Sequence, residues 1–189
     1  MLLKSSDQKI VVVTGAAGLI GSGIVRFLND QGMTRLVLVD DIKKTDKWKN
    51  LLNKRFIDFI SRYELFSWLE GREDQIGAFL HLGACSDTLE SDGNYLMQNN
   101  FYYTVRLAEY ALKQGHRFIY ASSAATYGDG RHGFVDDQDA LEQLEPLNLY
   151  GFSKYCFDLW AKNNGVLDKL IADYKAQGII VKSGRGLLE

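Results

Sequence analysis

Three glycines near the N-terminus could form a phosphate-binding turn. Gly15, Gly18 and Gly21 are spaced three residues apart, directly after an apolar segment and at the start of a helical pattern. In such a turn, the first glycine permits a tight bend, the second lets backbone approach a pyrophosphate, and the third allows close helix–strand packing. The helix N-terminus would offer amide groups and a positive dipole end to the phosphates. The spacing alone also fits a glycine-rich turn that binds no ligand.

An acidic residue follows this turn at the distance expected of a dinucleotide site. Asp40 lies 19 residues after Gly21, at the end of a second apolar segment. An acid at this place usually bonds the adenosine ribose 2′-hydroxyl. The strand, turn, helix, strand and acid together favour a dinucleotide site. Asp40 favours NAD, whereas Lys43, Lys44 and Lys47 could bind the 2′-phosphate of NADP or be solvated surface residues.

A tyrosine and a lysine four residues apart could exchange protons with a substrate. Tyr150 and Lys154 would share one face of a predicted helix. A nearby ammonium group stabilises tyrosinate and lowers the pKa of the phenol toward working pH. Ser122 and Ser123 end a predicted strand, where open α/β sheets bind ligands, so Ser123 could hydrogen-bond the reacting oxygen. The serines could equally cap a turn, and tyrosine and lysine are common on helix surfaces.

Apolar segments and helical patterns alternate along the chain and must position these residues. Short apolar segments predict strands at residues 9–14, 35–39, 55–58, 77–82 and 116–121. Periodic segments predict helices at residues 20–30, 62–70, 94–114 and about 149–162, and the tail predicts a helix after residue 169 and a strand at 178–182. This alternation is typical of right-handed crossovers in a parallel sheet. The sequence therefore predicts an α/β fold, a Rossmann-type doubly wound parallel sheet in a single three-layer domain over residues 1–189.

Composition excludes several other classes of protein. The 22 basic and 24 acidic residues give a formal charge of −2, which argues against nucleic-acid binding. No apolar run reaches the ~20 residues of a membrane-spanning helix, and the N-terminus lacks the apolar core of a secretory signal. The two cysteines, Cys85 and Cys156, are too few for a disulfide scaffold and fit a reducing cytoplasm. No spacing of His, Cys and acidic residues indicates a metal site.

Several longer strings resemble the extended short-chain dehydrogenase/reductase family of nucleotide-sugar epimerases and dehydratases. These strings occupy residues 13–22, 81–86, 99–100, 120–128 and 146–154. The strings Gly-Ala-Cys-Ser and Ala-Ser-Ser-Ala-Ala-Thr-Tyr-Gly are typical of the heptose 6-epimerase branch, and the others mark the family as a whole. The resemblance runs from about residue 9 to residue 168, whereas residues 169–189 diverge.

The resemblance implies an epimerisation with NADP as cofactor and NAD as the alternative. Tyr150 would act as the base while a hydride leaves the sugar and a transient ketone forms, and the hydride would return to the opposite face. Ser123 would hold the substrate oxygen, and Lys154 would hold the nicotinamide ribose. The substrate would be a nucleotide-sugar, ADP-heptose, which is a precursor of the lipopolysaccharide core.

The resemblance also implies further cofactor contacts by matching position. They are Gly15, Gly18, Leu19, Ile20 and Gly21 at the pyrophosphate, Asp40 and Asp41 at the adenosine ribose, Lys47 and Arg62 as basic groups that favour NADP, Asp58 at the adenine edge, Leu82, Gly83, Ala84, Cys85 and Ser86 beneath the cofactor, and Asn99 as one further contact.

Two other functions agree with the same residues. The chain could be another nucleotide-sugar 4-epimerase or dehydratase, or a dinucleotide-binding module without catalysis. Family members continue into a sugar-binding domain with an Arg-Tyr-Phe-Asn-type segment and a second catalytic lysine, neither of which this sequence contains. Lys182 falls in a predicted strand and is not assigned that role. The apolar faces of helices 94–114 and 149–162 could form a homo-oligomer, although core packing explains them equally well.

Overall fold

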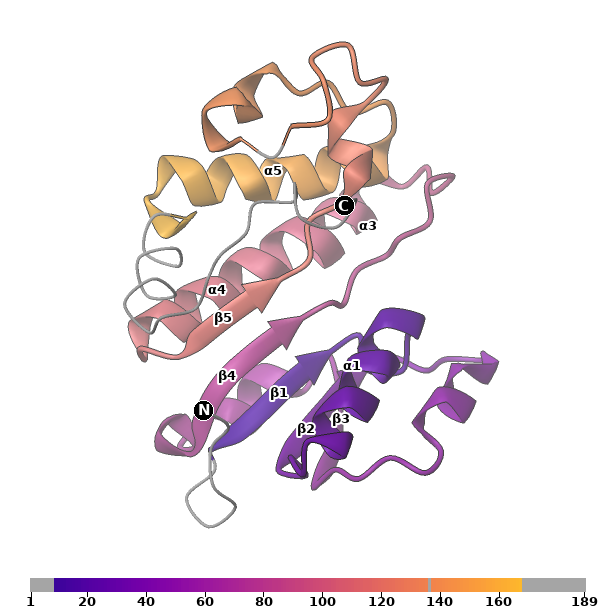
Figure 1. Ribbon diagram of the computed structural model, residues 1–189, viewed down its shortest axis with the longest axis vertical. Coiled ribbons are helices and arrows are strands. Elements are labelled where there is room, and N and C mark those ends of the chain that lie inside the picture. The colour runs from indigo at the N-terminus through magenta and orange to yellow at the C-terminus, as the bar shows by residue number, and fades with distance from the viewer. Residues whose placement is uncertain (1–8, 136, 168–189) are drawn as a thin grey trace. The chain divides into compact units, whose positions relative to one another are not determined.

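The computed structural model describes residues 9–135 and 137–167, which form two compact units that interleave along the chain (Figure 1). Of the described residues, 9–84 and 107–121 make up the first, here called the sheet unit, and 85–106, 122–135 and 137–167 make up the second, the helix unit. The helix and strand predicted for the tail lie outside the described residues. A single domain over residues 1–189 stays a prediction.

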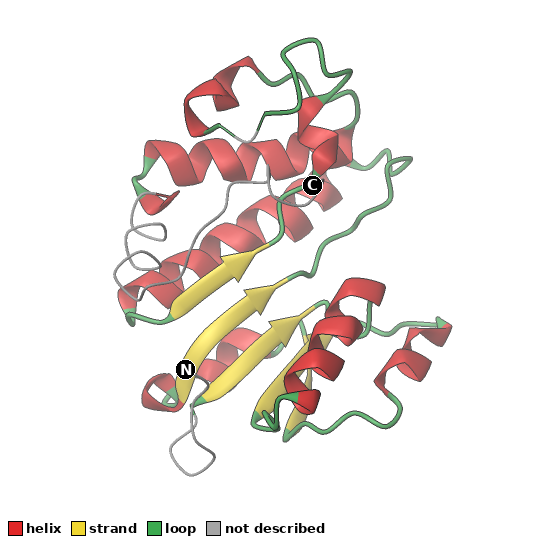
Figure 2. Cartoon of the chain, viewed as in Figure 1, coloured by secondary structure: helices red, strands yellow, loops and turns green. Residues whose placement is uncertain are grey.

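The sheet unit contains a parallel five-stranded sheet with the strand order β3-β2-β1-β4-β5 (Figure 2). Its strands are β1 (Ile10–Thr14), β2 (Leu36–Asp40), β3 (Asp58–Ser61), β4 (Ile76–His81) and β5 (Arg117–Tyr120). β1 and β2 are buried along their whole length, as expected of apolar strands covered on both faces. The strand order reverses between β1 and β4, and in open α/β sheets this switch point marks the ligand crevice.

Helices cover both faces of this sheet. Val11 and Val13 of β1 pack in one cluster with Val25 of α1 (Leu19–Asp30). On the other face, Phe79 of β4 meets the ring of Tyr110 edge-on, with ring centroids 5.9 Å apart. Tyr110 belongs to α4 (Tyr103–Lys113), whose residues from Leu107 onward lie in the sheet unit. Successive strand residues point to opposite faces, so this arrangement confirms the doubly wound α/β fold.

The third strand begins three residues later than predicted. The backbone of Arg55, expected in the strand, instead bonds the side chain of Asn29 in α1 through its amide (2.6 Å) and its carbonyl (2.8 Å). Pairing with β2 begins only at Asp58. The helix predicted over residues 62–70 is confined to α2 (Leu65–Leu69). Two 3-10 turns, η1 (Asp46–Leu51) and η2 (Glu73–Gln75), complete the connections.

The helix unit is built from the predicted long helix and the predicted C-terminal helix. The first consists of α3 (Gly93–Leu96), a π-helical turn η3 (Met97–Tyr102) and the start of α4. The 3-10 turns η4 (Ala124–Tyr127) and η5 (Gln138–Gln143) precede α5 (Leu149–Asn163). Asn148 caps α5 by accepting a hydrogen bond from the amide of Gly151 at 2.7 Å. Within the described ranges, no helix is both long enough and apolar enough to cross a membrane.

Candidate functional site

The turn between β1 and α1 depends on two of its glycines. Gly15 has φ +67°, and a Cβ placed there would lie 2.7 Å from the amide nitrogen of Gly83. A Cβ at Gly21 would lie 2.1 Å from the carbonyl oxygen of Gly15. A Cβ at Gly18 would be less crowded, at 3.2 Å from the same oxygen. Gly15 and Gly21 therefore allow the close approach of backbone segments, whereas Gly18 leaves space in front of the helix.

The N-terminus of α1 presents backbone amides to that space. The amides of Gly15 and Ala16 point to the carbonyl of Val39 at 2.8 and 3.4 Å, which fixes the turn to β2. Gly18 is the N-cap, and among the described residues no side chain caps the helix and no acid lies in its first turn. The first-turn amides, at Leu19 and Ile20, lack an intrahelical partner and can bind an anion.

Asp40 is bonded to the glycine turn itself. Its carboxylate is 8% exposed and accepts hydrogen bonds from the amide of Ala17 (2.8 Å), the amide of Asp41 (2.7 Å) and the Lys47 ammonium (2.6 Å). Asn50, on η1, donates to the carbonyl of Ala17 at 2.9 Å. Since a carboxylate has about four acceptor positions, one remains for a ribose hydroxyl. Asp40 thus joins the turn, the end of β2 and η1.

A cluster of charged side chains lies at the carboxyl ends of β2 and β3. The carboxylate of Asp41 lies 3.7 Å from Nε of Arg62 and 3.7 Å from Nζ of Lys43. The guanidinium of Arg62 stacks over the ring of Tyr63 at 4.4 Å. The structure therefore brings Asp41 and Arg62 together, one residue beyond the strands that carry them, and Lys47 lies on the adjacent Asp40. Basic groups at this edge could bind a phosphate.

The structure does not bring Asp58 to this edge. Asp58 pairs with Val37 at the start of the parallel β2, whereas Ser61 pairs with Asp40 at its end. Its carboxylate accepts hydrogen bonds from the indole of Trp68 (3.1 Å) and from its neighbour's amide. Three residues of strand separate Asp58 from the carboxyl edge, which is about 10 Å. The adenine-edge role that the resemblance implied for Asp58 is not supported by this position at the start of β3.

Thr14, which the motif analysis did not single out, joins the ends of β1 and β4. Its hydroxyl lies 2.6 Å from Nδ1 of the buried His81 and accepts from the amide of Gly83 at 3.1 Å. The amide of Leu82 donates to the Thr14 carbonyl at 3.2 Å. Leu82 and Gly83 are therefore held beside Gly15 at the switch point. The sequence feature that could have identified Thr14 is its position as a polar residue at the end of an apolar strand.

In the helix unit, the buried amide of Asn100 fastens the loop at Cys85 to α5. Its oxygen accepts from the amides of Cys85 and Asn99, both at 2.8 Å. Its nitrogen donates to the Cys85 carbonyl (2.9 Å) and to the Ser153 hydroxyl (3.0 Å). The Ser153 hydroxyl donates to the carbonyl of Tyr150 at 2.7 Å. Asn100 lies in the π-helical turn η3, a feature common at functional sites. The sequence motifs pointed to its neighbour Asn99 as a cofactor contact and not to Asn100. Ser86, another predicted cofactor contact, has an exposed side chain.

Tyr150, Lys154 and Ser123 lie on elements that pack together. A Cβ at Gly151 would lie 2.7 Å from the carbonyl oxygen of Ala125, so glycine lets the first turn of α5 approach η4. Ser123 is the N-cap of η4, and its hydroxyl oxygen accepts from the Ala125 amide at 3.2 Å.

The two side chains of the tyrosine–lysine pair differ in burial. Tyr150 is half-buried, whereas Lys154 is only 3% exposed. Burial lowers the pKa of the Lys154 amine, and the carboxylate of Asp158 opposes this by raising it. Tyr150 and Lys154 lie one helical turn apart, on the same face of α5.

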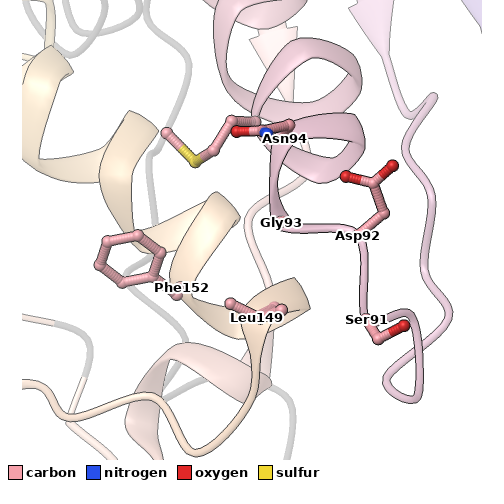
Figure 3. Close-up of a pocket in the computed structure, with 7 residues that line it drawn as sticks. Ser91, Asp92, Gly93, Asn94, Leu149 and Phe152 are labelled. Atoms are coloured by element: carbon pink, nitrogen blue, oxygen red, sulfur yellow. The ribbon is translucent and has the colours of Figure 1, made fainter.

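A pocket of about 400 Å³ lies between the start of α3 and the start of α5 (Figure 3). Asp92 and Asn94 line it from α3, and Leu149 and Phe152 line it from α5. The last two residues flank Tyr150 in the sequence. None of the residues predicted for the site lines this pocket.

Comparison with known proteins identifies the class. Residues 11–170 match the sequence profile described as the NAD dependent epimerase/dehydratase family. The chain belongs to this family, which confirms the resemblance seen in the motifs. The family's cofactor, by this description, is NAD.

Individual relatives show which members of the family this chain resembles. The chain is 48% identical over 160 residues to an ADP-L-glycero-D-manno-heptose-6-epimerase of Nitratidesulfovibrio vulgaris, covering 83% of this chain and 49% of the relative. It is 46% identical over 156 residues to the protein of that name from Fusobacterium nucleatum, covering 80% and 47%. The chain thus spans about half the length of the curated relatives it matches.

Solved structures show the same fold. The Helicobacter pylori ADP-L-glycero-D-manno-heptose-6-epimerase superposes with a TM-score of 0.68 and 25% identity, covering 84% of this chain and 52% of that one. The UDP-glucuronic acid 4-epimerase from Bacillus cereus in complex with NAD gives 0.64 and 26%, covering 82% and 52%. Both superpositions involve about half of the solved chain.

Proposed function

We propose that this chain is the cofactor-binding part of a nucleotide-sugar epimerase of the ADP-L-glycero-D-manno-heptose 6-epimerase type. The observation that carries the proposal is the packing of α5, with Tyr150 and the buried Lys154, against the turn that begins at Ser123. The identity of 48% to a relative of that name supports the choice of sugar. The proposal assigns ADP-heptose as the substrate.

The residues of the sheet unit fit a dinucleotide. The crowded glycines Gly15 and Gly21 keep side chains out of the turn, and the N-terminus of α1 carries amides without an intrahelical partner. The amides at Leu19 and Ile20 would hold the pyrophosphate, and Asp40 and Asp41 would bond the adenosine ribose. A nicotinamide cofactor held by these residues would supply reversible hydride transfer at the sugar carbon.

We assign NADP as the preferred cofactor, supported by the basic groups at the edge of β2 and β3. Lys47 and Arg62 already lie against Asp40 and Asp41, so their positions are held before any ligand binds. A 2′-phosphate would share these cations with the two carboxylates. NAD has no such group, and the same acids would bond its free ribose hydroxyls instead.

Side chains of this protein then carry out the proton transfer. The Tyr150 phenolate takes the proton of the reacting hydroxyl group and later gives it back, and Lys154 lies one helical turn away on the same face of α5. The Ser123 hydroxyl donates a hydrogen bond to the same substrate oxygen. Because its own oxygen already accepts from the Ala125 amide, the orientation of this hydroxyl is restricted. Lys154 would also bond the nicotinamide ribose.

Two further proposals concern the cellular location and the oligomeric state of the protein. The free thiols of Cys85 and Cys156 support a reducing, cytoplasmic location. The apolar Phe152, 47% exposed on α5, supports a homo-oligomer, which sedimentation velocity of the purified chain would test.

Calorimetric titration tests the cofactor assignment. The chain should bind NADP more tightly than NAD, and Gly18→Val should weaken NADP binding at least tenfold because the branched side chain fills the space before α1. Gly23→Val is the matched control, since a Cβ at Gly23 meets no atom within 4 Å. Unchanged NADP affinity in Gly18→Val would contradict the assignment of the turn.

Activity on ADP-heptose tests the chemistry. Tyr150→Phe should reduce the interconversion of the carbon-6 epimers by about 10²- to 10⁴-fold and leave NADP affinity within a few-fold, because only the phenolic proton is removed. A second candidate, 4-epimerisation of a UDP-sugar, is favoured by the likeness to the Bacillus cereus structure and predicts turnover of UDP-glucuronic acid instead. NADP binding with turnover of neither sugar would support a binding module.

A further inference from the structure

A buried carboxylate of α5 has no place in the proton transfer described above. Asp158 is 5% exposed and lies one helical turn beyond Lys154, on the same face of α5. Its Oδ2 accepts a hydrogen bond from the hydroxyl of Ser122 at 2.5 Å. Ser122 directly precedes Ser123, the residue that begins η4. One side chain therefore connects α5 to the turn of Ser123 and lies close to Lys154.

The charged side chains on the described elements around this part of α5 can be named one element at a time. α5 packs against α3 (with Asp92 as its N-cap), η3 and η4, and none of these three segments contains a Lys, Arg, Asp or Glu. Their titratable side chains are Tyr95, Tyr102 and Tyr127. η5 also packs against α5, but its Glu142 pairs with Lys162 at the far end of the helix, at 3.1 Å. The carboxylate of Asp158 raises the pKa of the Lys154 amine, whereas burial lowers it. A buried ammonium is stable only with such compensation.

We propose that Asp158 is a positioning residue for the reaction: it anchors the Ser123 turn to α5 through Ser122 and supplies the negative charge that compensates the buried ammonium of Lys154. This role rests on the proposed function, because it acts through two groups assigned to the epimerisation. The two contributions are separable, since one needs only a hydrogen-bond acceptor and the other needs a charge.

Three variants separate the anchor from the charge. Asp158→Asn keeps an acceptor for Ser122 and removes the charge, Ser122→Ala removes the hydrogen bond and keeps the charge, and Asp158→Ala removes both. Glu142→Gln is the control, because it removes an exposed acid from the surface pair with Lys162 on the same helix. Circular dichroism and thermal unfolding establish folding, and Asp158→Asn and Ser122→Ala carry the test if Asp158→Ala does not fold.

The first readout is the titration of the Lys154 Cε resonance in lysine-labelled chain, assigned with Lys154→Arg. Since an opposite charge favours the protonated amine, Asp158→Asn should lower the titration midpoint by about 1 pH unit or more. Ser122→Ala and Glu142→Gln should leave it within about 0.3 unit, well inside the change expected for loss of a charge. An unchanged midpoint in Asp158→Asn would overturn the charge role, whatever the chain catalyses.

The second readout is turnover of ADP-heptose with NADP affinity measured in parallel. Ser122→Ala should lower kcat about tenfold and leave the Kd of NADP within twofold, because the loosened turn misplaces Ser123. A wild-type kcat in Ser122→Ala would overturn the anchor role. A wild-type chain without turnover would instead contradict the proposed function, and the titration of Lys154 would still decide the charge role.

Discussion

The two units hold their functional residues by opposite means. In the sheet unit, backbone meets backbone: Gly15 lies against Gly83, Gly21 lies against Gly15, and the turn amides bond Val39. In the helix unit, buried side chains make the connections, with Asn100 joining a loop to α5 and Asp158 joining Ser122, which precedes η4, to the same helix. The first arrangement should fail when an atom is added, and the second when a polar atom is removed.

Adding one methyl group to the sheet unit should have the largest effect. Gly21→Ala places a Cβ 2.1 Å from the carbonyl oxygen of Gly15, which is backbone and cannot rotate away. We expect the free energy of unfolding to fall by more than about 3 kcal/mol. Gly23→Ala, on the same helix, meets nothing within 4 Å and should stabilise the chain by about 0.5–1 kcal/mol. Thermal denaturation that shows similar Tm values for the two variants would break the comparison.

Removing a polar side chain from the helix unit should come next. Asn100→Ala leaves the amide and carbonyl of Cys85 and the hydroxyl of Ser153 without their partner. The expected loss of stability is about 2–3 kcal/mol, measured by urea denaturation. Asn99→Ala removes one hydrogen bond to the same side chain and should cost about 0.5–1 kcal/mol. Equal losses in both variants would show that the Asn100 network contributes little.

Substitutions at the charged edge of the sheet unit should change the relative affinities for NADP and NAD rather than the stability of the fold. Lys47→Met removes the cation that lies 2.6 Å from Asp40, and NADP binding should weaken about tenfold while NAD binding changes less than threefold. Lys49→Met, on the same 3-10 turn, removes an exposed pair with Asp46 and a contact of the ammonium with the Trp48 ring, neither of which involves Asp40, and serves as the control. Calorimetric titration measures all four affinities. Parallel losses for NADP and NAD in Lys47→Met would contradict a 2′-phosphate role.

Exposed ion pairs should show the smallest effects, and similar ones in both units. Arg26→Ala breaks the pair with Asp30 on α1, and Lys162→Met breaks the pair between α5 and Glu142 of η5. Surface pairs contribute about 0.2–1 kcal/mol, so both variants should stay within about 0.5 kcal/mol of wild type in urea denaturation. A larger loss in one unit would mean that surface charge, and not the buried contacts above, holds that unit together.

Much of the fold was predictable because its signals are local. The apolar runs of β1 and β2 and the glycine turn between them lie within about thirty consecutive residues, and each matches its predicted place to within a residue or two. The third strand was placed wrongly because residues 55–61 form one continuous, largely apolar stretch. The side chain of Asn29, distant in sequence, decides where pairing with β2 begins.

The sequence by itself determined the parallel α/β class, the glycine turn and the positions of Ser123, Tyr150 and Lys154, since backbone conformation and helical spacing depend on adjacent residues. Only the tertiary structure decided which polar groups meet. Asn100 and Ser153 are 53 residues apart, and Ser122 and Asp158 are 36 residues apart. A buried polar side chain bonds whatever folding brings within reach, and that choice depends on packing between distant segments, which no local pattern records.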